Sequence, residues 1–163
     1  VEDGVLAGIY CFARSAHARI NLFGSGAVMT EVLAARELLE TQGYPVNVWS
    51  VTSYSELTRE ALAVERRNLL DPRSAPARPY VADCLADAEG VFIAASDYMK
   101  ALPLGIAPWV PGPYCVLGTD GYGLSEARPE LRDHFEVSGP WIAYAALRTL
   151  AVHDQREPDA ALT

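Results

Sequence analysis

The sequence predicts an α/β domain built on a mostly parallel mixed sheet with helices on both faces. The chain has 163 residues, half of them hydrophobic, which is enough for one domain with its own core. Short apolar runs alternate along it with segments of helical hydrophobic periodicity. Residues 19–39 are typical of a strand, a glycine turn and a helix, the unit with which doubly wound domains open.

This opening unit turns at Gly24-Ser25-Gly26. Residues 20–23 predict a short strand, and the two glycines permit an abrupt turn after it. The next helix is predicted from apolar residues at helical spacing: Val28, Val32, Ala35 and Leu39. Its bare start after Ser25 has free N–H groups that suit an anion, although a Gly-x-Gly without a third glycine is more typical of a close strand-to-helix turn.

Four further strands are expected. They cover residues 9–13, 46–51, 90–95 and 114–117. The strand at 9–13 is expected to pair antiparallel with the opening strand, because the connection at 14–18 is short. The other three are expected to be parallel, since longer segments precede each of them.

The remaining helices are predicted from start signals, apolar stripes and prolines. Ser53 followed by Glu56 is a capping box, and it starts a helix with the stripe Leu57, Ala61 and Val64. Short helices are expected over 80–86 and 128–135, a helix shortened by prolines over 97–110, and a last helix from Gly139. Three prolines make residues 70–79 an extended connection.

The predicted organisation has three parts. Residues 1–8 are a lead-in, residues 9–152 a single α/β domain, and residues 153–163 a polar tail. The chain begins at Val1 without a methionine, and we therefore expect a piece of a longer protein.

Composition disfavours several classes of protein. The formal net charge of −8 is a poor match to nucleic acid or to an anionic membrane. No run approaches the roughly 18 apolar residues of a membrane span, and no signal peptide is recognisable. The three cysteines lie in or beside apolar runs, so we expect buried, reduced thiols in a cytoplasmic protein.

No catalytic or metal-binding residue is predicted. His17, His134 and His153 are scattered and have no metal-ligand spacing. Ser25 does not lie in the Gly-x-Ser-x-Gly turn that exposes a nucleophile, and the sequence has no Gly-x-x-x-x-Gly-Lys motif.

Candidate binding residues follow the predicted parallel strands at their carboxyl ends, where ligands and partners of open α/β sheets bind. They come from the glycine turn, from the segment after residue 95 and from a glycine-rich loop at 118–125. The candidates for binding or interdomain contact are Gly24, Ser25, Gly26, Asp97, Lys100, Asp120, Gly121, Tyr122 and Ser125. The loop glycines indicate a structural demand, which packing against another domain explains as well as catalysis does.

Several blocks of the sequence point to one family when they are taken together. They are Val48-Trp-Ser-Val-Thr-Ser-Tyr-Ser-Glu-Leu, Glu65-Arg66 with Asn68, Ser96-Asp-Tyr-Met-Lys, Val116-Leu-Gly-Thr-Asp-Gly-Tyr-Gly and His134-Phe-Glu-Val. In order and spacing, from about Gly8 to Ala151, the chain resembles the C-terminal domain of the homodimeric bacterial pyruvate dehydrogenase decarboxylating component. Separate blocks in register are far more specific than any single motif here.

The resemblance implies a transketolase C-terminal type of fold within a thiamine diphosphate-dependent oxidoreductase. The implied chemistry is decarboxylation of pyruvate and reductive acetyl transfer to a lipoyl group on a partner acyltransferase. In such enzymes thiamine diphosphate and Mg²⁺ lie between the two preceding domains. This domain is therefore expected to bind neither by itself, and to support the homodimer and the preceding domains without catalysis. The family's cofactor motif opens Gly-Asp-Gly and closes Asn-Asn, whereas no asparagine follows Gly118-Thr-Asp-Gly.

Two departures from the family pattern keep alternatives open. The chain has Tyr122-Gly-Leu124-Ser where the family often has Phe-Gly-Arg-Ser, so any contact of that arginine is lost. Leu104-Gly105 stands where relatives tend to carry polar helical residues. The chief alternative is a regulatory or ligand-binding α/β module of a divergent 2-oxo acid dehydrogenase or transketolase-like enzyme, which uses the glycine turn and the glycine-rich loop. A stand-alone enzyme is the third interpretation.

Overall fold

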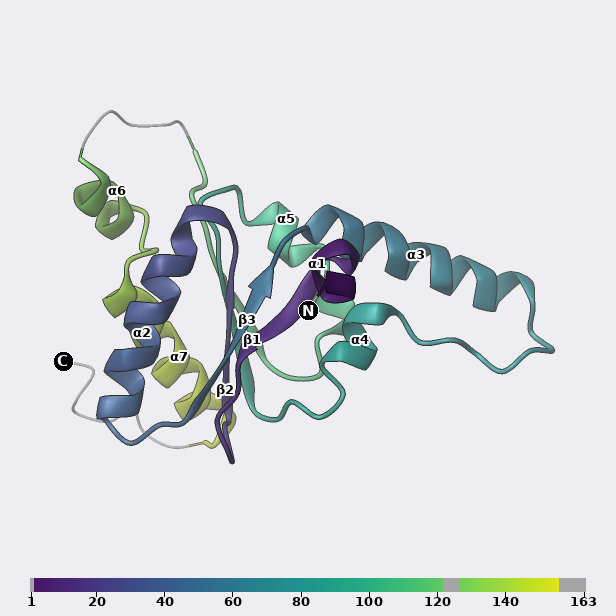
Figure 1. Cartoon of the computed structure of the whole chain (residues 1–163), viewed down its shortest axis with the longest axis horizontal. Coiled ribbons are helices and arrows are strands. Elements are labelled where there is room, and N and C mark those ends of the chain that lie inside the picture. The colour runs from purple at the N-terminus through teal and green to yellow at the C-terminus, as the bar shows by residue number, and fades with distance from the viewer. Residues whose placement is uncertain (1, 122–126, 156–163) are drawn as a thin grey trace.

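The computed structural model describes residues 2–121 and 127–155, and it forms a five-stranded sheet between two layers of helices (Figure 1). The spatial order of the strands is β1-β3-β2-β4-β5. Their bounds are β1 Ile9–Ala13, β2 Ile20–Gly24, β3 Val46–Val51, β4 Val91–Ala95 and β5 Tyr114–Leu117. Each lies within a residue of the predicted strand.

The sheet is mostly parallel, as predicted. β2 pairs in parallel with β3 and β4, and β4 pairs in parallel with β5. The predicted partner of β1 is wrong, because β1 is antiparallel to β3 and not to β2, with Ile9 opposite Val51. Residues 14–19 therefore pass the end of β3, where the Ser15 N–H donates to the Asn47 side chain at 3.0 Å. Six residues can cross two strand spacings, which is about 10 Å.

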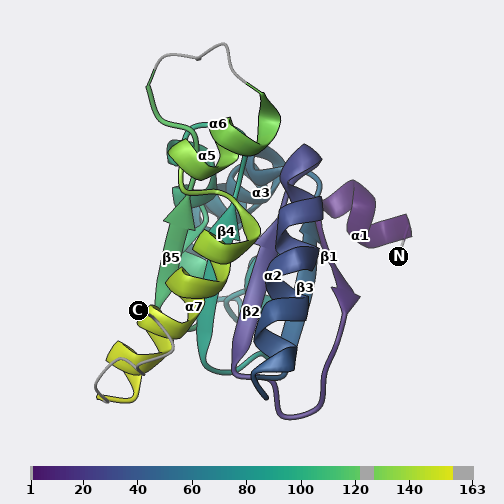
Figure 2. The same ribbon diagram turned by 90° about the vertical axis from the view of Figure 1, so that its left-hand side faces the viewer.

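The helices form two layers on opposite faces of the sheet (Figure 2). One layer consists of α2 (Met29–Thr41) and α7 (Gly139–His153), and α6 (Arg128–His134) lies at its carboxyl-end edge. The other layer holds α3 (Tyr54–Leu70), α4 (Tyr80–Cys84), α5 (Ala101–Leu104) and the 3-10 helix η2 (Ala107–Trp109). The predicted helix after the glycine turn begins as a 3-10 turn, η1 (Gly26–Val28).

A short helix at the start of the chain was not predicted. The lead-in contains α1 (Glu2–Ala7), which packs on β1 so closely that a Cβ on Gly4 would lie 2.7 Å from the Tyr10 Cβ. Six residues with a glycine among them carry no readable periodicity, so tertiary contact decides this helix. The last helix ends at His153, where the polar tail was expected to begin.

The α2–α7 face of the sheet holds an aliphatic core. Alternate strand residues point to this face, and they pack against the predicted stripe of α2 and against α7. The buried members include Ile20, Leu22, Val48, Ile93, Val32, Leu39 and Ile142. The stripe predicted for the opening helix is therefore confirmed, including Val28 and Ala35.

The α3 face holds an aromatic core. Phe23 lies at its centre, with ring centroids 5.9 Å from Phe92, 6.0 Å from Tyr114 and 6.5 Å from Trp49. Tilted and edge-to-face pairs at such distances are favourable beyond the area they bury. The predicted stripe Leu57, Ala61 and Val64 is buried, and Leu57 packs in this cluster.

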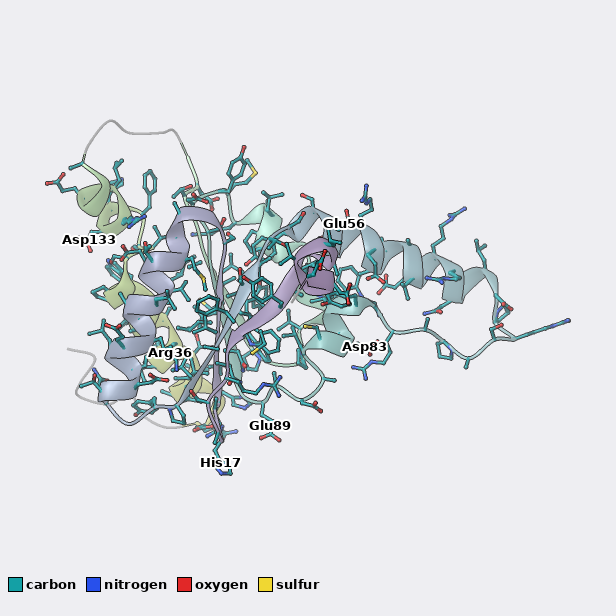
Figure 3. The ribbon with its side chains drawn as sticks, viewed as in Figure 1. His17, Arg36, Glu56, Asp83, Glu89 and Asp133 are labelled. Atoms are coloured by element: carbon teal, nitrogen blue, oxygen red, sulfur yellow. The ribbon has the colours of Figure 1, made fainter. Side chains whose placement is uncertain are left out.

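Charged side chains project from the outer surface. Arg36 lies on α2, Glu56 on α3 and Asp133 on α6 (Figure 3). The described helices include none that could cross a membrane. The cysteines are free and half-buried, and burial raises the pKa of the Cys84 and Cys115 thiols, which keeps these two protonated at neutral pH.

Candidate functional site

The carboxyl ends of β2, β3 and β4 meet at a topological switch point. β2 leads into α2 on one face, whereas β4 leads towards α5 on the other. A crevice opens where the connections diverge in this way. Here it is a cavity of about 280 Å³, whose lining includes Ser25, Gly26, Ser53, Ser55, Ser96 and Asp97. We call it the switch-point cleft.

The glycine turn and Asp97 come together in this cleft. Gly26 has a φ of +57°, and the Asp97 carboxylate oxygens lie 3.3 and 3.4 Å from where a Cβ on Gly26 would stand. A carboxylate is favourable beside a helix start because of the helix dipole. The same negative charge repels a further anion, so a phosphate or diphosphate is a poor fit at this turn.

Lys100 and Asp120 are bound to each other. The main-chain N–H of Lys100 donates to Asp120 Oδ1 at 2.9 Å, and the side-chain ammonium of Lys100 lies 3.8 Å from Asp120 Oδ2. The Thr119 hydroxyl donates to the Asp97 carbonyl at 2.8 Å, and its N–H donates to the Tyr98 carbonyl at 3.0 Å. The loop after β5 is thus fastened to the loop after β4, and both candidate charges are used in that contact.

Two glycines of the predicted loop have different surroundings. A Cβ on Gly118 would lie 2.7 Å from the Tyr98 carbonyl oxygen, so this glycine serves close packing of the two loops. Gly121 has a φ of +103°, and a Cβ there would meet nothing within 4 Å, so only its backbone conformation requires glycine. Tyr122 and Ser125 lie outside the described residues.

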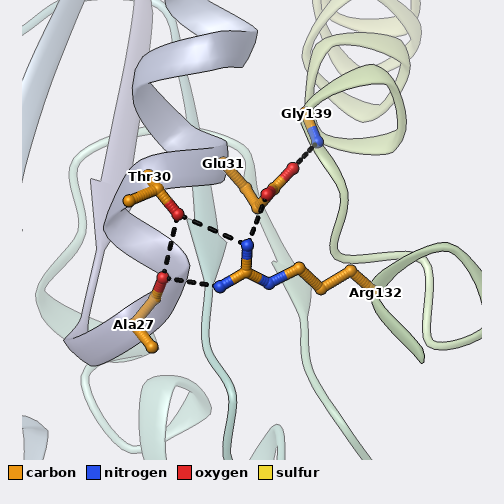
Figure 4. A network of polar contacts seen from close by, with 5 residues as sticks. All are labelled: Ala27, Thr30, Glu31, Arg132 and Gly139. Carbon is orange, nitrogen blue, oxygen red and sulfur yellow. Dashed lines mark hydrogen bonds and ion pairs between the residues drawn. The ribbon is translucent and has the colours of Figure 1, made fainter. Parts of the chain in front are cut away.

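A polar network beside the cleft was not predicted. The Arg132 guanidinium donates to a Glu31 carboxylate oxygen at 2.6 Å and to the Ala27 carbonyl at 3.0 Å (Figure 4). The other Glu31 oxygen accepts the Gly139 N–H at 2.8 Å. We call Glu31, Arg132 and Gly139 the clasp. It holds α6 and the start of α7 against the start of α2, through contacts between residues about a hundred positions apart, which no local pattern reveals.

Ser53 is also engaged within the fold. Its hydroxyl accepts the Glu56 N–H at 3.1 Å, as an N-cap does. The Glu56 carboxylate pairs with Arg59 rather than closing the second half of the predicted capping box. Ser53 therefore lines the cleft as a helix cap.

Tyr54 lines the cleft, and its hydroxyl lies near that of Tyr114. Tyr114 donates to the Pro103 carbonyl at 3.0 Å, and the buried Tyr54 hydroxyl lies near it without a hydrogen bond of good geometry. Burial raises the pKa of both tyrosines, so both hydroxyls stay neutral at neutral pH.

The histidines lie apart in the structure as in the sequence. His17 is at the tip between β1 and β2, at the amino end of the parallel strands, whereas His134 belongs to α6 and His153 to the end of α7 (Figure 3). Among residues 2–121 and 127–155, no three His, Cys, Asp or Glu side chains form a group that could hold a metal ion.

These features define an open α/β domain whose strand-end loops are bound mainly to one another. The chain belongs to the transketolase-like C-terminal domain family, whose sequence model matches residues 8–138. The predicted fold and family are thereby confirmed.

The curated relatives are much longer proteins. The chain is 43% identical to the pyruvate dehydrogenase E1 component of Pseudomonas aeruginosa, over 96% of this chain and 18% of that protein. It is 40% identical to the pyruvate dehydrogenase E1 component of Escherichia coli, over 92% of this chain and 17% of that protein. The chain spans less than a fifth of the curated relatives it matches.

Solved transketolases share the fold. The enzyme from Pichia stipitis superposes with a TM-score of 0.64 at 17% identity, over 99% of this chain and 20% of that chain. A structure described as a split-gene transketolase, inactive beta4 tetramer, has a TM-score of 0.57 at 12% identity, over 85% of this chain and 41% of that chain.

Proposed function

We propose that the chain is the C-terminal domain of a thiamine diphosphate-dependent pyruvate dehydrogenase E1 component, and that it supports assembly without catalysing the reaction. The observation that carries this proposal is the identity of about 40% over nearly the whole chain to a small part of such enzymes. Its partners would be the preceding domains, the homodimer partner and the lipoyl acyltransferase, in the cytoplasm.

The residues at the switch point support a role outside catalysis. Thiamine diphosphate needs a site for its diphosphate and Mg²⁺, and the Asp97 carboxylate stands at the helix start that would otherwise suit an anion. Asp120, the acid of Gly118-Thr-Asp-Gly, is paired with Lys100. These residues do not fit the cofactor, and we assign no step of its chemistry to them.

A titration and an activity assay test this proposal. The purified 163-residue chain should bind thiamine diphosphate with Mg²⁺ no more tightly than millimolar, which is about −4 kcal/mol. It should release no CO₂ from pyruvate, whereas the longer polypeptide that includes the preceding domains should do so. Micromolar binding or turnover by the chain alone would favour the stand-alone enzyme.

The Asp97→Asn variant is the control for the titration. Removing the carboxylate charge should strengthen the weak binding of diphosphate several-fold if Asp97 repels anions. Unchanged affinity would show that diphosphate does not approach the glycine turn.

The switch-point cleft favours one second candidate, a regulatory or ligand-binding module. Several hydroxyls and one carboxylate face a cavity of about 280 Å³, which suits a small neutral or cationic polar molecule better than a phosphate. Screening such compounds by thermal shift, with Asp97→Asn as the control, separates this candidate from an assembly role.

A further inference from the structure

The layer that contains α3 leaves many apolar side chains exposed. Twelve large apolar side chains are exposed among the described residues, and half of them belong to α3 or to the segment at 98–104. They are Leu62, Leu69, Leu70, Tyr98, Met99 and Leu104. On α2 and α7, the exposed large apolar side chains among the described residues are Leu38, Tyr144 and Val152. Exposed apolar residues that adjoin a groove are typical of an interaction surface.

One of these residues, Leu62, lines a mostly apolar groove whose wall also includes the charged Arg59. It lies between α3 and α5, has a volume of about 410 Å³, and is lined by Thr58, Leu62, Ala101, Leu102 and Gly105 among others. It adjoins the switch-point cleft, with which it shares Tyr54, Ser55 and Leu102.

Two exposed leucines of α3 share one face of the helix, with the exposed charged residues Glu65 and Arg66 between them. Leu69 lies seven residues after Leu62, which places both on the same face of the helix two turns apart. Leu62 is 54% exposed and Leu69 is 80% exposed. We call the groove together with Leu62, Leu69, Tyr98 and Leu104 the α3–α5 surface.

Polar contacts hold α3 in place although its C-terminal end extends beyond the sheet (Figure 1). Glu65 accepts the Trp109 ring N–H at 2.8 Å, and Glu60 accepts the Tyr80 N–H at 3.0 Å. Asn68 is bonded to Ala77 twice, at 2.8 and 2.9 Å. These bonds fix the helix against the returning chain while its leucines face outward. A helix held in place in this way binds with little loss of conformational entropy.

We infer that the α3–α5 surface docks against the preceding part of the same polypeptide. This inference rests on the proposed function, in which the chain is one domain of an enzyme several times longer. The start of the described chain lies close to the start of α3. The Thr52 hydroxyl, two residues before α3, donates to the Val5 carbonyl of α1 at 2.8 Å. A preceding domain therefore connects beside α3, and the groove would receive a leucine-sized apolar side chain from it.

Charge disfavours a second copy of the chain as the occupant. Each copy carries a formal net charge of −8, so bringing two copies together is opposed by repulsion.

Cysteine labelling in the longer polypeptide tests the inference. Leu62→Cys is the probe, and Val152→Cys is the matched control, because Val152 is 58% exposed and lies on the opposite layer. Labelling is followed at each position by peptide mass spectrometry, so the native thiols are scored separately. In the longer polypeptide the cysteine at position 62 should react at least tenfold more slowly than the one at 152. Where the chain is a separate subunit, its complex with the subunit that carries the preceding domains is labelled instead.

Other outcomes overturn the inference. Equal rates at the two positions, or protection at 152 alone, would place the domain contact elsewhere. Protection at 62 that rises with the concentration of the 163-residue chain alone would assign the surface to a second copy. Pyruvate decarboxylation by the same preparation is measured in parallel. If position 62 were protected but the preparation did not decarboxylate pyruvate, the proposed function would be contradicted, whereas the inference that the α3–α5 surface is a docking surface would still hold.

Discussion

The two helical layers cover the same sheet but differ on their outer sides. In the α2–α7 layer, small residues bring the helices close, and a Cβ on Gly139 would lie 3.1 Å from the Ala34 Cβ. The clasp then ties both helix starts and α6 together. In the α3 layer, the inner side is buried against the sheet, but the outer side presents leucines and a mostly apolar groove.

We expect this difference to separate residues that determine folding from residues that contact another part of the protein. The clasp and the close contact of α2 with α7 tie the α2–α7 layer together within the chain, so we expect its residues to determine folding. The leucines on the outer side of the α3 layer contribute little to folding stability, because they are largely exposed to solvent. Substitutions there should matter only when the rest of the enzyme is present.

Truncating one leucine or isoleucine in each layer should show the largest contrast. Ile142→Ala removes a fully buried side chain between α7 and the sheet, and should lower the free energy of unfolding by about 2–5 kcal/mol. Leu69→Ala should change it by no more than about 0.5 kcal/mol. Urea unfolding followed by circular dichroism measures both. A large loss for Leu69→Ala would mean that α3 needs its outer leucine for folding.

The sequence predicted the elements well because local patterns determine them. The stripe of α2 and the cap of α3 are both readable within a few residues, and both are confirmed. The partner of β1 was wrong because the short connection fits either neighbour, and the choice depends on the packing of the whole sheet.

The site was predictable only as separate pieces. Gly26 and Asp97 were each candidates, yet their approach depends on β2 and β4 being neighbours. The clasp was missed altogether, since Glu31 and Arg132 carry no signal before the fold joins them. Glu65 and Asn68, which helped to carry the family resemblance, hold α3 in position.

The clasp should contribute an intermediate amount to stability. Glu31→Gln removes the charge that pairs with Arg132, where both side chains are only 21% exposed, and should cost about 1–2 kcal/mol. Arg36→Gln is the control, because it breaks the more exposed pair with Glu40 on the same helix and should cost no more than about 0.5 kcal/mol. Equal losses in chemical denaturation would show that the clasp acts as an ordinary surface pair.

Removing the N-cap of α3 should have the smallest effect on stability of the three changes, and it tests whether Ser53 serves only the fold. Ser53 accepts the Glu56 N–H, and Ser53→Ala should therefore cost about 1 kcal/mol, the usual value for a lost N-cap. Ser55→Ala is the matched control, since Ser55 lines the same cleft beyond the cap position and should change stability by less than about 0.5 kcal/mol. Thermal unfolding of the chain and activity of the longer enzyme are measured for both variants. If Ser53→Ala lowered activity at unchanged stability, Ser53 would act on a ligand or partner in the cleft, and the inner side of the α3 layer would be functional as well as its outer side.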